Sequence, residues 1–143
     1  MKPYIHQVQY YETDRMGITH HSNYIRWMEE ARVAFLEELG WGYGKLEAMG
    51  IVSPVTQVSC DFKKTTTFPD RIAIEVSIRE FRGVKLFLSY RMINEETKEA
   101  AAEGMSGHCF LNHEGRPLLL KKVCPELDRI LKDLSENPPS AES

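Results

Sequence analysis

Near residue 50, hydrophobic positions along the chain change from helical to alternating spacing, and this change predicts the order of the main elements. Before it, apolar residues recur at the interval of one helix face, and they are Tyr24, Trp27, Met28, Ala31 and Phe35. After it, apolar and polar residues alternate, which is typical of strands with one buried face. The clearest alternation is at Ile72, Ile74, Val76 and Ile78. The pattern predicts one long helix followed by several antiparallel strands.

Residues that favour turns and helix ends bound these elements. A first strand is expected at residues 4–11. Ser22 and Asn23 are both common N-cap residues, and Gly40 suits the position just after a helix, so the long helix is expected between them. Pro125 suits the first position of a final helix. The other expected elements are a short helix at 44–49, strands at 56–62, 72–78, 86–92 and 104–111, and turns at 82–83, 94–98 and 112–115.

The two patterns together define a fold class. A helix with one apolar stripe must bury that stripe, and an antiparallel sheet with one apolar face must bury that face. We therefore expect an α+β fold in which an antiparallel sheet wraps around a long central helix. The 143 residues suffice for one such domain, which we place at residues 1–134. The polar tail at 135–143 has little to bury and is expected to be disordered.

Charge and composition narrow the range of partners. The formal net charge of −3 argues against nucleic acid or an anionic membrane surface as the main partner. No apolar run approaches the ~20 residues of a membrane helix, and the first residues lack the apolar core of a signal peptide. Cys60, Cys109 and Cys124 are an odd set without metal-like spacing, which suits a reducing cytoplasm. Cys60 and Cys109 are expected to be small buried residues.

The candidate chemistry lies between the first strand and the long helix. Asp14 comes a few residues before the helix N-terminus, which offers unpaired backbone N–H groups and the positive end of the helix dipole. A carboxylate beside an amide that polarises a carbonyl is the minimum equipment for hydrolysing an activated acyl group. A turn-capping side chain would explain Asp14 equally well. Gly17 permits a positive φ or a close approach by a ligand.

This segment resembles the 4-hydroxybenzoyl-CoA thioesterase family of hotdog-fold proteins, including its YbgC-like acyl-CoA branch. The matching residues are Asp14-Arg15-Met16-Gly17, then His21, then Asn23-Tyr24. The order of later elements also fits, over residues 3–134. The resemblance implies a hotdog-fold thioesterase that hydrolyses an acyl-CoA to a free acid and CoA without a cofactor. Hotdog proteins commonly pair edge strands, so it also implies a dimer or a dimer of dimers with active sites between subunits.

The resemblance further implies roles for the residues of the motif. Asp14 would attack the thioester carbonyl or activate water to do so, and the backbone N–H at His21 would polarise the carbonyl. The His21 side chain would orient the acid, donate to the carbonyl or assist departure of the thiolate. A capping or surface histidine is the alternative. Gly17 would shape the catalytic turn.

Four further residues are candidates for binding the substrate. The resemblance places Asn23 and Tyr24 at the start of the central helix and makes them candidates for binding the substrate. The phosphates of CoA call for cations, and Arg82 and Lys85 occupy a turn where the family often carries basic residues. This turn is less basic than in the family, because Gly83-Val84 interrupts it. Ordinary exposed turn charges would explain the two cations equally well.

Other chemistries find less support. His20, His21, Asp14 and Glu12 are residue types that bind metals, but their spacing matches no known metal site. We treat His20 as a bystander. Neither a serine nucleophile elbow nor a phosphate-binding glycine loop occurs in the sequence. The main alternative function is a noncatalytic module on the same fold that binds acyl-CoA or acyl-carrier protein and needs no ionised acid. A hotdog dehydratase or isomerase is a second alternative, although its His and Asp placements are not found.

Overall fold

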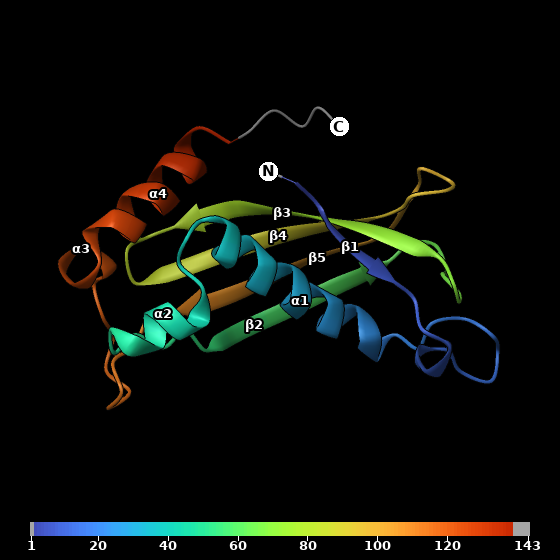
Figure 1. The fold of residues 1–143 in the computed structure, drawn as a ribbon, viewed down its shortest axis with the longest axis horizontal. Helices are drawn as coiled ribbons and strands as arrows, with labels where there is room; N and C mark the ends of the chain where they lie inside the picture. Colours follow the sequence, from blue (N-terminus) through green and yellow to red (C-terminus); the bar gives the residue numbers. More distant parts are fainter. Residues whose placement is uncertain (1, 139–143) are drawn as a thin grey trace.

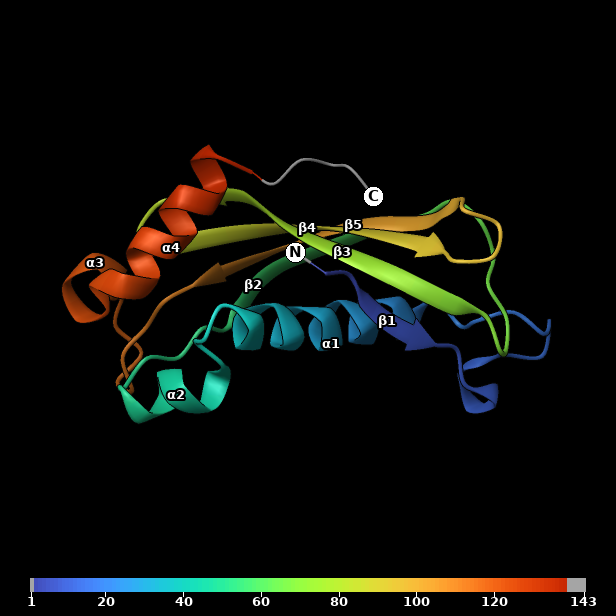
Figure 2. The same ribbon diagram turned by 45° about the horizontal axis from the view of Figure 1, so that its top comes forward.

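The computed structural model describes residues 2–138, which form one antiparallel sheet with helices on both of its faces (Figures 1 and 2). The sheet has five strands in the order β1-β3-β4-β5-β2. The strands are β1 Tyr4–Gln7, β2 Val55–Phe62, β3 Arg71–Phe81, β4 Lys85–Asn94 and β5 Ala100–Cys109. The other elements are the 3₁₀ turn η1 Tyr10–Glu12 and the helices α1 Ser22–Glu38, α2 Tyr43–Ala48, α3 Leu120–Val123 and α4 Pro125–Glu136. The expected α+β architecture is confirmed.

The long helix α1 lies along one face of the sheet, while α3 and α4 lie over the other face at one end (Figure 2). The stripe predicted from the sequence is the buried face of α1, since Trp27, Met28 and Ala31 are almost completely buried. Burying a large apolar side chain stabilises a fold by about 1.5–3 kcal/mol. The same core includes Ile72, Ile74, Leu88 and Met92 of the sheet. No helix among residues 2–138 is long and apolar enough to cross a membrane.

β5 passes close to α1 and to β2 at Gly104. A Cβ atom at this position would lie 2.9 Å from the carbonyl oxygen of Ser59 and 3.0 Å from Sδ of Met28. Distances this short are closer than van der Waals contact, so a side chain here would push α1 or β2 away. The glycine therefore sets the depth at which α1 packs on the sheet.

α1 ends where the sequence predicts. Gly40 has φ +87°, and its N–H donates to the carbonyl of Glu37 at 2.9 Å. The Trp41 N–H donates to the carbonyl of Leu36, also at 2.9 Å. These two bonds form a Schellman motif, in which a left-handed glycine closes the helix.

Several boundaries differ from the expectation. β1 ends at Gln7, because the chain turns into η1 instead of continuing as a strand. α4 continues to Glu136, so the first two residues of the expected disordered tail are helical, and residues 139–143 of that tail lie outside the described part. Cys124 is buried, whereas Cys60 and Cys109 are only half-buried. Both of the latter lie on strands near the open side of the sheet.

β2 is more exposed than its alternating pattern suggests. It is an edge strand that pairs with β5 alone, and its side chains Val58 and Phe62 are 43% and 52% exposed. A single chain thus leaves both the backbone edge of β2 and several apolar side chains uncovered, a combination that natural sheets usually protect.

A chain of buried polar groups ties α1 to the sheet, and the sequence analysis missed it. Nη1 of Arg32 donates to Oη of Tyr90 at 3.1 Å, and this oxygen lies 2.7 Å from Oγ of Ser106. Ser106 Oγ lies 2.7 Å from Nε2 of His108. Because a guanidinium can only donate, Tyr90 accepts from Arg32, and its own hydroxyl hydrogen is then available to Ser106. Burial, followed by repulsion from Arg32, lowers the pKa of His108 to about 4, so this histidine is neutral at neutral pH.

Replacing Gly104 by alanine is expected to destabilise the protein by about 1–3 kcal/mol, the usual effect of overpacking a core. Gly44→Ala is the matched control, because nothing lies within 4 Å of a Cβ atom at Gly44 and alanine is the better helix former. Urea unfolding measures both free energies. An unchanged free energy for Gly104→Ala would show that α1 and β2 move apart without cost, contrary to the packing argument.

Candidate active site

The segment between β1 and α1 folds back on itself as a tight loop at one end of the sheet (Figure 1). The Asp14 N–H donates to the carbonyl of Ile18, and the Gly17 N–H donates to the carbonyl of Asp14, both at 2.9 Å. Gly17 has φ +79°, so its freedom from a side chain serves this turn. Oδ1 of Asp14 accepts from the Met16 N–H at 2.8 Å. The structure therefore contains the turn-capping hydrogen bond that was one of the two explanations of Asp14.

The same carboxylate keeps its other oxygen available. Within residues 2–138, Oδ2 of Asp14 takes part in no hydrogen bond or ion pair, and the residue is half-buried. A carboxylate with one oxygen held and one free is oriented and still able to react. The capping and the reactive interpretations of Asp14 are therefore compatible.

The start of α1 leaves one backbone donor unused. The Ser22 N–H donates to Nδ1 of His20 at 3.2 Å, and the N–H groups of Asn23 and Tyr24 donate to the carbonyls of His20 and His21. The N–H of His21 has no acceptor among the described residues. The His20 ring thus contacts the start of α1, and its place outside the chemistry stays a prediction. The unused donor is at the position where the resemblance places a carbonyl-polarising amide.

Glu12 joins the loop to the start of α1 through its main chain. Its carbonyl oxygen accepts from the His20 N–H at 2.8 Å and from Nδ2 of Asn23 at 3.0 Å. Nδ2 of Asn23 also lies 3.2 Å from the carbonyl of His20. The structure therefore brings the Asp14 turn and the His21 amide into one corner, with the Asn23 side chain committed to holding that corner together.

Glu12 also carries a buried carboxylate, 5% exposed, that sequence reasoning considered only as a weak metal ligand. Burial raises its pKa, but hydrogen bonds from His6, Trp27 and the Gln9 amide together outweigh burial and hold the pKa of Glu12 below its usual value. In the sequence, the one feature that pointed to Glu12 was its position two residues before Asp14. Its partners come from β1 and α1, so only the fold reveals the cluster.

Tyr24 forms a wall behind the loop. Its Oη lies 2.9 Å from Oγ1 of Thr66, which lies 2.6 Å from Oγ1 of Thr19. The ring packs edge-on against Phe62, with centroids 5.2 Å apart, and the His21 ring lies 6.1 Å from the same phenylalanine. Burial raises the pKa of Tyr24. Because its hydroxyl is occupied by Thr66 and the residue is almost completely buried, Tyr24 contributes a packed ring and not a free hydroxyl.

The two expected phosphate-binding cations lie at the other end of the sheet. β1 pairs with the first residues of β3, which puts the Asp14 loop at the start of β3. The 11 residues of β3 span roughly 33 Å, and Arg82 and Lys85 follow its far end. Arg82 pairs with Glu80 and lowers the pKa of that carboxyl. Within one chain, these cations do not reach the corner that holds Asp14.

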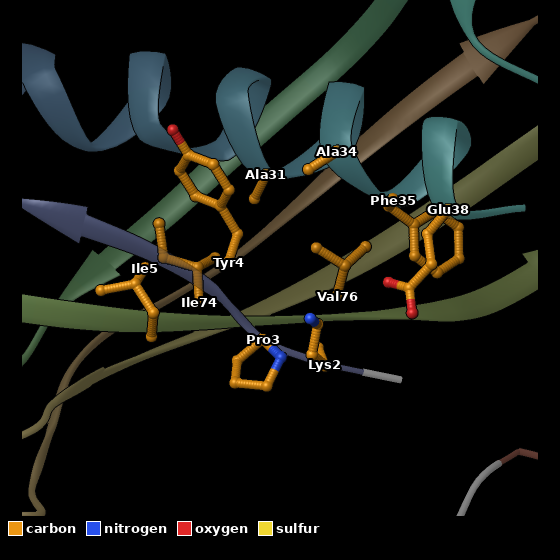
Figure 3. A pocket seen from close by; sticks show the side chains of 10 residues that line it. All are labelled: Lys2, Pro3, Tyr4, Ile5, Ala31, Ala34, Phe35, Glu38, Ile74 and Val76. Atoms are coloured by element: carbon orange, nitrogen blue, oxygen red, sulfur yellow. The ribbon is translucent and has the colours of Figure 1, made fainter.

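A surface hollow of about 300 Å³ lies between β1, α1 and β3 (Figure 3). Its lining includes Tyr4, Ala31, Phe35 and Val76, and none of the site residues predicted from the sequence contributes to it. Elsewhere in the described ranges, no three His, Cys, Asp or Glu side chains are grouped so that they could hold a metal ion. The corner around Asp14 is therefore the candidate active site, although it is open in a single chain.

Known proteins resemble this chain along most of its length. Residues 8–140 match the Thioesterase-like superfamily. YneP of Bacillus subtilis (strain 168), provisionally named an acyl-CoA thioesterase, is 31% identical over 121 residues, covering 84% of this chain and 87% of YneP. The acyl-CoA thioester hydrolase YbgC of Escherichia coli O157:H7 is 26% identical over 90 residues, covering 63% and 67%. A DHNA-CoA thioesterase from Staphylococcus aureus has a similar structure, with a TM-score of 0.87 and 25% identity over 97% of this chain and 96% of that one. The hotdog fold implied by the motif is confirmed.

Proposed function

This chain belongs to the thioesterase-like superfamily, and from that premise we propose that it hydrolyses an acyl-CoA thioester to a free carboxylic acid and CoA. Asp14 acts as nucleophile or general base, and the backbone N–H of His21 polarises the thioester carbonyl. The observation that carries these roles is an amide without an acceptor among residues 2–138, in the same corner as a carboxylate with a free oxygen.

The two groups meet the two demands of the reaction. The carbonyl oxygen becomes negative in the tetrahedral intermediate, and a donor at the positive end of a helix stabilises it by about 3–4 kcal/mol. Asp14 either attacks the carbonyl carbon, which releases the CoA thiolate and leaves an acyl-enzyme anhydride for water to hydrolyse, or takes a proton from water that attacks directly. No cofactor is needed in either route.

The neighbouring residues complete the site. The His21 side chain is exposed and stacks on His20, with ring centroids 4.3 Å apart, so it is available to assist departure of the thiolate. Gly17 shapes the turn that presents Asp14. Asn23 holds the start of α1. The buried Tyr24 ring supports the exposed ring of Phe62, which offers an aromatic surface to the acyl group. The substrate is carried by CoA or by an acyl-carrier protein.

Replacing Asp14 by asparagine is expected to reduce kcat by at least ~10³ on every accepted substrate, since the ionised oxygen is lost. Asparagine keeps an oxygen that accepts from the Met16 N–H, so the turn should survive. Release of free thiol from short-, medium- and long-chain and aromatic acyl-CoAs measures the rate, and circular dichroism checks the fold. Equal rates in both proteins would rule out the role of Asp14, and binding without hydrolysis in both would favour the noncatalytic binding module.

Replacing His21 by proline tests the amide itself. His21 has φ −58°, which a proline ring accepts, and proline is well tolerated at the start of a helix. The variant lacks the N–H and the imidazole, and we expect kcat to fall by about 10²–10³. His21→Ala is the matched control, because it removes the imidazole and keeps the N–H. If the alanine variant loses as much activity as the proline variant, the side chain and not the amide carries the effect.

We further propose that two chains form one dimer through β2, and that each active site contains residues of both. The β2 edge and its apolar side chains are uncovered in the single chain. Antiparallel pairing of two β2 strands would continue the sheet and place the Phe62 end of one strand beside the Val55 end of the other. Val55 pairs with His108, and His108 with Leu86. The Val55 end is therefore the end of the sheet that carries Arg82 and Lys85.

This arrangement predicts complementation between two inactive variants. Asp14→Asn lacks the acid, and the double variant Arg82→Ala/Lys85→Ala lacks the cations. A mixed dimer has one site with both the acid and the cations intact, so unfolding and refolding the two proteins together should restore up to about a quarter of the native activity. Thiol release at low acyl-CoA concentration measures it. Activity no higher than the mean of the two parent proteins would show that acid and cations do not share a site across subunits.

A further inference from the structure

The carboxylate of Glu12 is the centre of a buried cluster that connects three elements. Its Oε1 accepts from Nε2 of His6 at 2.9 Å and from the Gln9 N–H at 2.8 Å. Its Oε2 accepts from Nε1 of Trp27 at 2.9 Å. Nδ1 of His6 continues the cluster to Oε1 of Glu30 at 3.0 Å. Glu12 is thereby linked to β1 through His6, to its own turn through Gln9 and to α1 through Trp27 and Glu30.

The donors around Glu12 favour an ionised carboxylate at this position. An indole N–H and a backbone N–H can only donate, and one of them faces each oxygen of Glu12. A glutamine in the same place would turn its own NH₂ group toward either Trp27 or Gln9, so one buried donor would face another. Such a mismatch leaves a buried polar group unsatisfied, which is costly in a site this enclosed.

The main-chain carbonyl of Glu12 connects the two segments that carry the Asp14 carboxylate and the His21 amide. The Glu12 carbonyl accepts from the His20 N–H at 2.8 Å and from Nδ2 of Asn23 at 3.0 Å. His20 directly precedes the free amide of His21, and Asp14 comes two residues after Glu12. The side chain thus anchors Glu12 to the body of the fold, while its carbonyl fixes the start of α1 relative to the Asp14 turn.

We propose that Glu12 is a positioning residue that sets the distance between the Asp14 carboxylate and the His21 amide. The proposal rests on the proposed thioesterase function. Glu12 is only 5% exposed and its oxygens are occupied by the donors described above. It therefore acts through the position of the loop and not by contact with the substrate.

The test compares Glu12→Gln with Glu12→Asp and with the control Glu29→Gln. Glu29 is an exposed acid on the same helix as Trp27, and its one polar partner among residues 2–138 is Arg32, at 4.0 Å. Because a displacement of about 1 Å at a reacting group can cost 10²-fold in rate, we expect Glu12→Gln to lower kcat by about 10–100-fold. We expect KM to change by less than about 3-fold, because the residue does not touch the substrate. Glu12→Asp should recover part of kcat, and Glu29→Gln should leave both constants unchanged.

Amide hydrogen exchange supplies a readout that does not depend on catalysis. In Glu12→Gln the amides of residues 13–23 should exchange faster, whereas those of β3 and β4 should keep their native rates. A fall in the free energy of unfolding with unchanged kcat and unchanged exchange in 13–23 would make Glu12 a structural residue and overturn the proposal. If Glu12→Gln does not fold, Trp27→Phe removes one donor to Oε2 and should show the same effects to a smaller degree.

The two readouts separate failure of the positioning role from failure of the proposed function. A native protein without thioesterase activity would contradict the proposed function, and exchange in residues 13–23 would still decide whether Glu12 holds the loop. An active native protein whose Glu12→Gln variant keeps the native kcat would contradict the positioning role alone.

Discussion

Burial of one face of α1 against the sheet positions everything around the candidate site. Trp27 shows how closely the two are coupled, because its ring is fully buried in the core while its Nε1 donates to Glu12 beside the Asp14 loop. Gly104 allows the helix to pack at this depth. Since interiors are close-packed and transmit small shifts, a displacement of α1 on the sheet would also displace the helix start and its free amide.

The candidate site is built mostly from main-chain groups and held by buried side chains. The Asp14 turn closes through backbone bonds, and the donor at His21 is a backbone N–H. Hydrogen bonds among the side chains of His6, Glu12 and Trp27 fix the position of this main chain. Such a division suits catalysis by preorganised dipoles, because the donors need no rearrangement as charge develops on the substrate.

Two features of the single chain support the proposed dimer. β2 presents an unpaired backbone edge with exposed Val58 and Phe62, and the cations proposed to bind CoA lie the length of β3 away from Asp14. Antiparallel pairing of β2 with a second copy would cover this edge. It would also bring opposite ends of the two sheets together, so that the cations of one chain lie near Asp14 of the other. The proposed dimer is therefore supported both by the uncovered edge of β2 and by the distance between Asp14 and the cations within one chain.

The sequence by itself determined the features that depend on local spacing. The helical stripe of Trp27, Met28 and Ala31 and the alternation of the strands were readable because periodicity is a property of neighbouring residues. Asp14 and Gly17 could be proposed as site residues because their motif is contiguous, and the helix end at Gly40 was predicted because it has a local signature. The exposure of β2 was missed, since alternation does not say whether a strand lies at the centre or the edge of a sheet.

Tertiary structure decided every feature whose parts lie far apart in the chain. The role of Glu12 became visible only in the fold, where β1 and α1 bring His6 and Trp27 into contact with it. The buried hydrogen-bond chain from Arg32 to His108 likewise forms only because α1 lies on β4 and β5. Arg82 was separated from Asp14 by the direction of β3, although both were sound candidates by residue type. The physical reason is the same in each case: a hydrogen bond or an ion pair depends on distance in space, and the fold alone converts separation along the chain into that distance.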